Sequence, residues 1–349
     1  MIIALDAMGG DRAPAEPVKG ALLANRELGL QVALVGLPEM VREELAHHGP
    51  VPSGIEVVAA SQAIAMDEAP ALAVRQKKDA SINVAMDLVK RGVAGGVVSA
   101  GNTGALMASA LLNLGRVPGI ERPAIGTMAP YTSPGTLVLD VGANVDCKPS
   151  YLVQFAQMGA VYMERVYGIE RPRVGLFNIG EEPTKGNELT QEVYARLRES
   201  GLHFIGNVEP DRVHHGLVDV VVTDGFTGNL AVKAAEGTAD FIFSQLKAVI
   251  QSRPQYRLAA LLLRPALLRL RRRMDYGEYG GAPLLGVNGV VIVAHGRADA
   301  QAMKNALRTA QEAASSGMLD AMRDALGTGA SGARAAGSSG PSNSGETSA

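Results

Sequence analysis

Short apolar segments alternate with longer amphipathic segments along this 349-residue chain, and this alternation limits the possible folds more than any other feature. The chain begins with IIALDA, a helix-like stretch over residues 15–29, and QVALVG. Several of the short segments are apolar at every position, which is typical of strands covered by helices on both faces. We therefore predict an α/β fold, an α/β/α sandwich around a mostly parallel sheet.

One pair of strands is expected to break the parallel pattern. The segments PAIGTMAP and GTLVLDVG are joined by YTSPG, and so short a connection favours an antiparallel hairpin. The sheet should therefore be mixed. The other strand candidates are IEVVAA, AGGVVSA, RVGLFNIG, DVVVTDG and GVVIVAHG.

The sequence predicts one folded body and a tail. Residues 1–326 contain no linker rich in Gly, Ser or Pro, so we expect a single α/β body with a helical excursion at about residues 235–285. Residues 327–349 are mostly Gly, Ser and Ala. Such a segment buries too little apolar surface to offset the entropy of ordering, and we predict that it is disordered.

Composition excludes several classes of protein. The net charge of −2 gives no support for nucleic-acid binding. Cys147 is the only cysteine, which excludes an intramolecular disulfide and suits a reducing compartment. The N-terminus has no charged region before its short apolar run, and no apolar run approaches the roughly 18 to 20 residues of a membrane-spanning helix. We expect a cytoplasmic protein.

Polar, glycine-containing turns follow most of the predicted strands. The carboxyl ends of parallel strands meet at one edge of a sheet, so we expect these turns to line a common site. Glycine lets backbone N–H groups face a ligand, and a following helix adds partial positive charge, which suits a phosphate. The turns contribute these candidate substrate-binding residues: Asp6, Gly9, Gly10, Asn102, Thr103, Gly104, Asn144, Asp146, Lys148, Asn178, Asn207, Asp224, Thr227 and Gly228.

The turn around Asn102 is the strongest anion candidate, because it immediately precedes a helix-like run. It matches neither a Walker A motif nor a dinucleotide fingerprint, so a small phosphate is the better ligand. An ordinary helix cap is the alternative explanation for this turn. Lys185 stands out among the lysines, and His295 is a candidate acid or base; a solvated lysine and a partly buried histidine are the alternatives.

Several motifs together resemble one known family over residues 1 to about 320. They are IALDAMGGD, KKDASINVAMDLVKRGVAGGVVSAGNTGALMA, DVGANVDCKP, NIGEEPTKGN, VVTDGFTGN and AHG, in this order. The chain is similar to the bacterial phosphate acyltransferase (PlsX) family. The resemblance implies transfer of a long-chain fatty acyl group from acyl carrier protein to inorganic phosphate, for phospholipid synthesis. It also implies a homodimer with the fold of isocitrate and isopropylmalate dehydrogenases, without their nicotinamide cofactor.

The reaction implied by the resemblance fits the residues. Phosphate itself attacks the thioester, so the site needs an anion cradle and an oxyanion hole rather than a nucleophilic side chain. Neither a G-x-S-x-G elbow nor H-E-x-x-H metal-ligand spacing occurs in the chain, and we expect no metal or cofactor. We expect Lys185, Asn229 and His295 to be catalytic, with Lys185 and Asn229 holding the phosphate and the developing negative charge.

The stretch RPQYRLAALLLRPALLRLRRR, residues 253–273, combines leucines with arginines. We expect two short helices that bend at Pro265 and touch an anionic membrane at the inner face of the cell. The arginines could instead dock acyl carrier protein, and the leucines could form a subunit interface. A downstream glycerol-phosphate acyltransferase is a possible partner. The expected contact residues are Leu258, Leu261, Leu262, Leu267, Arg269, Arg271, Arg272 and Arg273.

Two other functions compete with this interpretation. Similar Gly and Asn turns could serve a phosphotransacetylase-like enzyme that uses a short acyl group on coenzyme A. The leucine-rich excursion favours the long-chain reaction. A non-catalytic membrane scaffold is the second alternative, and it requires the leucine-rich stretch but not the turns.

Overall fold

The computed structural model describes residues 1–129, 134–274 and 280–335. Its strands are β1 (Ile2–Asp6), β2 (Gln31–Gly36), β3 (Ile55–Ala59), β4 (Gly96–Ser99), β5 (Ala124–Ala129), β6 (Thr136–Leu139), β7 (Val174–Phe177), β8 (Phe204–Val208), β9 (Val220–Val222), β10 (Ala282–Leu285) and β11 (Val290–Val293). Its helices are α1 (Ala15–Leu28), α2 (Pro38–Ala46), α3 (Pro70–Gln76), α4 (Ser81–Lys90), α5 (Thr103–Asn113), α6 (Pro149–Tyr167), α7 (Glu188–Arg198), the 3-10 helix η1 (Val213–His215), α8 (Gly225–Ser252), α9 (Pro254–Met274), α10 (Ala300–Ser315) and α11 (Met318–Ala335).

All the described strands belong to one sheet of 11 strands, in the order β3-β2-β1-β4-β11-β10-β5-β6-β9-β7-β8. Most neighbouring strands are parallel, but β10 is antiparallel to both β11 and β5, and β5 is antiparallel to β6. The α/β class and the mostly parallel, mixed sheet are therefore confirmed. One consequence is that β6, β9, β7 and β8 run opposite to β1, β2, β3, β4 and β11.

The predicted hairpin is present. β5 and β6 pair antiparallel with Gly126 opposite Leu139 and Ala129 opposite Thr136. Residues 130–133 of the predicted tight turn lie outside the described residues. The sequence prediction missed β10, which is only four residues long and contains Pro283, so it lacks both a long apolar run and clear alternation.

Helices cover both faces of the first half of the sheet, as its two-sided apolar strands predict. Ile3 and Leu5 of β1 pack with α1 and α10, whereas Ala4 of the same strand packs on the face covered by α4 and α5. In the second half, α6, α7 and α11 contribute to one large apolar cluster. A smaller cluster that includes Val138 and Val221 lies apart from it.

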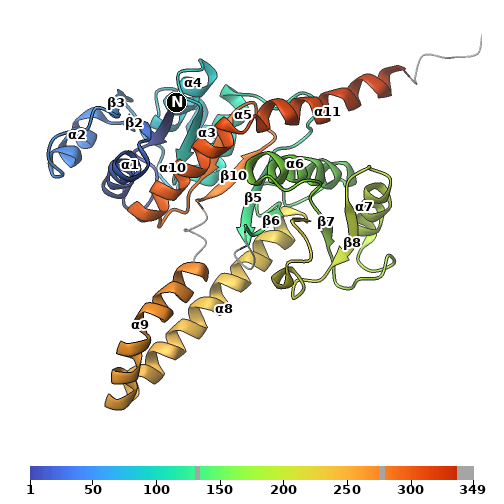
Figure 1. The fold of residues 1–349 in the computed structure, drawn as a ribbon. Coiled ribbons are helices and arrows are strands. Elements are labelled where there is room, and N and C mark those ends of the chain that lie inside the picture. The colour runs from blue at the N-terminus through green and yellow to red at the C-terminus, as the bar shows by residue number, and fades with distance from the viewer. Residues whose placement is uncertain (130–133, 275–279, 336–349) are drawn as a thin grey trace, which may run out of the picture.

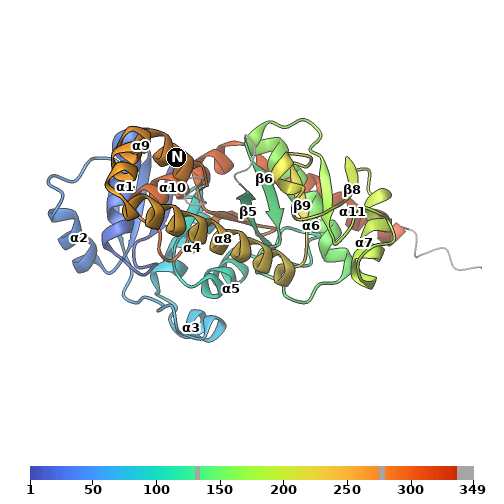
Figure 2. The ribbon, with the colours of Figure 1, turned by 90° about the horizontal axis from the view of Figure 1, so that it is seen from below.

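The predicted excursion is a pair of long helices that project from the body side by side (Figures 1 and 2). The prediction of two short helices that meet at Pro265 is wrong, because Pro265 lies inside the continuous helix α9. The chain instead turns at Arg253, whose backbone is extended between α8 and α9. Leu, Ala and Arg on both sides of Pro265 are strong helix formers, which offsets the cost of about 3 kcal/mol for an interior proline.

The end of the described chain also differs from prediction. Helix α11 continues to Ala335, past the predicted start of the disordered tail at residue 327, although residues 327–335 include three glycines. The rest of that prediction, residues 336–349, lies outside the described residues. Among the helices that the structure describes, none has the length and apolar character needed to cross a bilayer.

Candidate active site at the strand ends

The candidate residues fall into two groups, set by the reversal of strand direction at β10 and at the β5–β6 hairpin. The strands that carry these turns do not all run in one direction, so the premise that the turns share one edge of the sheet is wrong, whereas the common site expected from it stays a prediction. The first group follows β1, β4 and β11 and contains Asp6, Gly9, Gly10, Asn102, Thr103, Gly104 and His295. The second group follows β6, β7, β8 and β9 and contains Asn144, Asp146, Lys148, Asn178, Lys185, Asn207, Asp224, Thr227, Gly228 and Asn229.

In the first group, the loops after β1 and β4 touch through their backbones. A Cβ on Gly9 would lie 2.7 Å from the amide nitrogen of Gly101 and 2.8 Å from Ser99 Oγ, so no side chain fits there. Gly10 has φ +106°, a conformation that favours glycine, and lies against Gly296 of the turn after β11. The loops that follow β1, β4 and β11 are therefore in contact through glycine residues.

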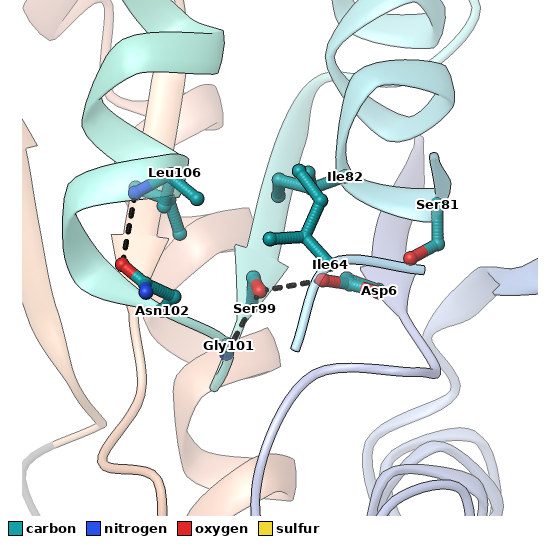
Figure 3. Close-up of a pocket in the computed structure, with 9 residues that line it drawn as sticks. Asp6, Ile64, Ser81, Ile82, Ser99, Gly101, Asn102 and Leu106 are labelled. Carbon is teal, nitrogen blue, oxygen red and sulfur yellow. Dashed lines mark hydrogen bonds between the residues drawn. The ribbon is translucent and has the colours of Figure 1, made fainter. Parts of the chain in front are cut away.

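Asp6 connects the loops after β1 and β4 through hydrogen bonds. Its side chain is buried and accepts hydrogen bonds from Ser99 Oγ at 2.7 Å and from the Met8 amide at 3.1 Å (Figure 3). Burial raises the pKa of Asp6, and hydrogen bonds from Ser81, Ser99 and Met8 oppose part of that rise. Phosphate binding was the role predicted for Asp6. A buried carboxyl group that already accepts these hydrogen bonds is better suited to position the loops.

Asn102 acts as a helix cap, which was the alternative explanation for its turn. Its Oδ1 accepts from the Ala105 amide at 3.1 Å, and its Nδ2 donates to the carbonyls of Met66 and Glu68. Thr103 and Gly104 form the first turn of α5 behind this cap. The cavity between Asn102 and Asp6 is about 10 Å³, room for about one water molecule and not for a phosphate (Figure 3).

His295 lies two residues after the apolar strand β11 and is exposed rather than partly buried. The backbone on either side of it is fixed, because the Ala294 amide donates to the Ser99 carbonyl at 2.8 Å and the Asp11 amide donates to the Gly296 carbonyl at 2.8 Å. Its Nδ1 accepts a hydrogen bond from the Arg297 amide at 3.1 Å. The imidazole therefore lies at the junction of the three first-group loops.

The second group is organised around Asp140, which the sequence prediction missed. The side chain is fully buried, and its Oδ1 accepts from the amides of Ile125, Gly142 and Ala143 at 3.0–3.2 Å. Its Oδ2 accepts from the Asn144 amide at 2.7 Å and from Asn144 Nδ2 at 2.9 Å. Burial raises the pKa of Asp140, and these hydrogen bonds oppose the rise. An aspartate directly after an apolar strand was the available sequence signal.

The start of α8 rests directly on this loop. A Cβ on Gly228 would lie 2.0 Å from the Asp140 carbonyl oxygen, and one on Gly225 would lie 2.6 Å from that of Asn144. Asp224 caps the helix, because its carboxylate accepts from both the amide and the hydroxyl of Thr227 at 2.8 Å. Asp224, Thr227 and Gly228 thus have structural roles, and Asn144, which also donates to the Pro123 carbonyl, is buried beside Asp140.

Asn178 and Asn207 are also buried and support the loop that carries Lys185. Asn178 Nδ2 donates to Asn207 Oδ1 at 3.1 Å and to the Lys185 carbonyl at 3.2 Å, and Asn207 Nδ2 donates to the Glu182 carbonyl at 2.8 Å. The Lys185 side chain is about half exposed, with Nζ 4.0 Å from a Glu182 carboxylate oxygen. A loop held by two buried amides therefore presents this lysine to solvent.

The remaining second-group side chains are exposed: Asp146, Lys148 and Asn229. The Asn229 amide nitrogen lies over Gly142, 2.9 Å from the position that a Cβ would take there. Since the buried asparagines are engaged, the donors that face solvent are Lys148, Lys185, Asn229 and His295. Within residues 1–129, 134–274 and 280–335, no group of three or more His, Cys, Asp or Glu side chains is placed to hold a metal ion.

Cys147 lies next to this group but is not poised to react. Its Sγ is 3.5 Å from the Asn144 carbonyl oxygen, to which the thiol donates. Burial raises the pKa of the thiol to about 12, and the nearby carboxylates of Asp140, Asp224 and Asp146 add to the rise. The protonated thiol therefore dominates at neutral pH, whereas the thiolate is the nucleophilic form.

Asp140→Asn should lower the free energy of unfolding by about 2–4 kcal/mol, because an amide cannot accept all the hydrogen bonds of the carboxylate and leaves buried N–H groups unpaired. Urea denaturation measures the change. Asp146→Asn is the matched control, since Asp146 is exposed on the same loop, and it should shift stability by less than about 0.5 kcal/mol. Equal effects of the two variants would contradict the role given to Asp140.

Comparison with known proteins agrees with this fold and composition. A family model described as fatty acid synthesis protein matches residues 1–321. A phosphate acyltransferase of Heliobacterium modesticaldum is 53% identical over 325 residues, which cover 93% of this chain and 97% of the relative. A phosphate acyltransferase of Desulfitobacterium hafniense is 51% identical over 327 residues, with 93% and 98% coverage.

Solved structures support the fold alone. A phosphotransacetylase from Streptococcus pyogenes superposes with a TM-score of 0.59 at 18% identity and covers 89% of this chain and 94% of its own. A 4-hydroxythreonine-4-phosphate dehydrogenase from Klebsiella pneumoniae gives 0.54 at 16% identity, with 90% and 99% coverage. The chain thus shares its overall fold with these two enzymes. The chain is an acyltransferase that belongs to the phosphate acyltransferase family of fatty acid synthesis proteins.

Proposed function

We propose that this acyltransferase moves a long-chain fatty acyl group from acyl carrier protein to inorganic phosphate, by direct attack of phosphate on the thioester, and so supplies acyl phosphate for phospholipid synthesis. One observation carries the direct mechanism. The strand ends present exposed donors at Lys185, Asn229 and His295, while the thiol of Cys147 is partly buried, and its pKa of about 12 keeps it protonated at neutral pH. These groups can bind and stabilise anions, and they do not form an activated nucleophile with its base.

In this mechanism a phosphate oxygen forms a bond to the thioester carbonyl carbon, and the carbonyl electrons move to its oxygen. Collapse of the tetrahedral intermediate breaks the carbon–sulfur bond and releases acyl phosphate and the carrier thiolate, which then takes a proton. Lys185 offsets the charge of the phosphate, and Asn229 donates to the developing oxyanion. We place the phosphate between the two groups of strand ends, because α5 begins at Asn102 of the first group and shares an apolar cluster with Val141 and Ala143 of the second.

A coenzyme A dependent reaction remains the alternative enzymatic function, whereas membership of an acyltransferase family argues against a non-catalytic scaffold. The deciding experiment incubates the purified protein with radioactive phosphate and either palmitoyl carrier protein or acetyl coenzyme A. The proposal requires labelled acyl phosphate from the carrier protein. Product only from acetyl coenzyme A would establish the alternative, and product from neither would refute both.

The helix pair α8 and α9 is proposed to meet an anionic membrane, which would make the cytoplasmic enzyme peripheral to the inner face of the cell membrane. Leu258, Leu261 and Leu262 are 66%, 63% and 80% exposed. Leu267 is half-buried and Arg269 is exposed, and Arg271, Arg272 and Arg273 follow in the same helix. Each basic residue near an anionic surface contributes about 1 kcal/mol. Release at the bilayer would place the poorly soluble product beside a glycerol-phosphate acyltransferase.

Helix α8 also carries exposed apolar side chains, among them Phe241, Ile242 and Val249, each more than half exposed. This surface suits the homodimer that the resemblance implies. The arginines of α9 could also dock the acidic carrier protein, and the two uses of α9 do not conflict.

Cys147→Ala should retain most of the activity, because phosphate attacks the thioester without an acyl-enzyme. Initial rates of acyl phosphate formation, together with mass spectrometry of the enzyme after mixing with acyl carrier protein, measure this. A folded but inactive variant, or an acyl group trapped on Cys147, would show that the attack is not direct.

Lys185→Ala and Asn229→Ala should each reduce the rate about a hundred- to a thousandfold, the usual cost of removing one preorganised donor. Lys233→Ala is the matched control, because Lys233 is an exposed lysine of the same region whose Nζ pairs with Glu236 at 2.7 Å. Circular dichroism should show that all three variants are folded. Rates within a fewfold of wild type for both site variants would remove these residues from the mechanism.

Leu262→Glu should weaken binding to vesicles that contain anionic lipid, because it places a charge at an apolar contact. Leu112→Glu is the control, since Leu112 is an exposed leucine of α5, 55% exposed, outside the helix pair. Replacing Arg271, Arg272 and Arg273 with Ala should weaken binding in a salt-sensitive manner. If Leu262→Glu instead yields monomers by light scattering and the wild type does not bind vesicles, α9 is a subunit interface rather than a membrane contact.

A further inference from the structure

The hydrogen bond at His295 Nδ1 determines what the imidazole can do. The Arg297 amide donates to this nitrogen at 3.1 Å, so Nδ1 must be unprotonated to accept. A neutral imidazole carries one proton, which then resides on Nε2. The two ring nitrogens point in diverging directions, so the nitrogen that is free of the turn is a donor. His295 therefore has no free basic nitrogen in its neutral form.

His295 is exposed, and the charged side chains around its turn, two acidic and two basic, balance one another. The turn is walled by glycine backbone, because Gly10 lies against Gly296 and neither has a side chain. Arg12 adds a positive charge, since its Nη2 donates to the Arg297 carbonyl at 2.7 Å. The charged side chains that face this turn are Asp11, whose Oδ1 lies 3.5 Å from the position of a Cβ on Gly296, together with Arg12, its partner Glu16 and Arg297.

We infer that His295 binds the substrate phosphate by donating a hydrogen bond from Nε2–H to one of its anionic oxygens, and that it is not a general base. This inference rests on the proposed function and names a specific role at the same site. It also agrees with the chemistry, because phosphate is already an anion at neutral pH and needs no side chain to deprotonate it before attack. The C–O bond forms and the C–S bond breaks without proton transfer to His295.

Three substitutions of His295 separate the possible roles. His295→Asn keeps an acceptor for the Arg297 amide, but its side chain is too short to place an N–H group at the position of Nε2. His295→Gln places its amide N–H near the position of Nε2–H. His295→Ala removes both functions. The measurements are kcat and the KM for inorganic phosphate with acyl carrier protein substrate, over the pH range in which imidazole titrates, and the thermal stabilisation of each protein by phosphate.

If His295 donates a hydrogen bond to the charged phosphate, His295→Asn and His295→Ala should raise the KM for phosphate about 10- to 100-fold, with kcat within a fewfold of wild type. Gln should recover most of this loss, and phosphate should stabilise the Gln variant but not the other two. The pH profile should keep its shape in all three variants.

Each competing role gives a different result. A general base predicts that Gln, Asn and Ala lose kcat equally and that the ascending limb of the pH profile disappears. A purely structural role in the turn predicts that Asn behaves as wild type and Gln does not. Either outcome overturns the inference. Wild-type protein that makes no acyl phosphate would instead refute the proposed function, so the two failures are distinguishable.

Discussion

Strand β10 constrains the rest of the molecule, because it is antiparallel to both of its neighbours and joins two sets of parallel strands into one sheet. Two antiparallel pairings in succession make β5 run in the same direction as β11, and the antiparallel pairing of β5 with β6 then reverses the strands beyond it. The loops with chemical function follow the ends of these strands. The division of the candidate residues into two groups is thus set by the pairing of the strands and not by the side chains of the loops.

Each half of the sheet has a buried aspartate at the end of a strand, and its carboxylate accepts hydrogen bonds from the neighbouring loops. Asp6 ends β1 and Asp140 follows β6, and both are buried acceptors for N–H or O–H groups of the loops beside them. Tight turns leave amides that cannot pair with a strand, and a carboxylate can accept several of them. Burial raises the pKa of both groups, so the loops are ordered at an electrostatic cost that their hydrogen bonds offset.

Much of the fold could be predicted from sequence because hydrophobic period and turn length are local signals. The alternation of segments predicts the α/β class, and the short connection after β5 predicts the antiparallel hairpin. The direction of the second half follows from three successive antiparallel pairings, two of which involve β10, a four-residue strand with a proline and no local signature. The candidate residues were found at strand ends, but sequence does not reveal which asparagine caps a helix, as Asn102 does, and which faces solvent, as Asn229 does. Asp140 was missed because its role depends on contacts with Ile125, which are formed only in the folded chain.

Helix α8 connects the candidate site residue Asn229 with the membrane contact proposed for α9. Asn229 is near the start of the helix, which with 28 residues at 1.5 Å each extends about 42 Å to the turn before α9. Gly228 packs directly against the Asp140 carbonyl, so the start of α8 is in close contact with the loop that follows β6. Under the functions proposed above, an acyl phosphate formed beside Asn229 would lie about 42 Å along the helix axis from the leucines of α9 that are proposed to meet the membrane.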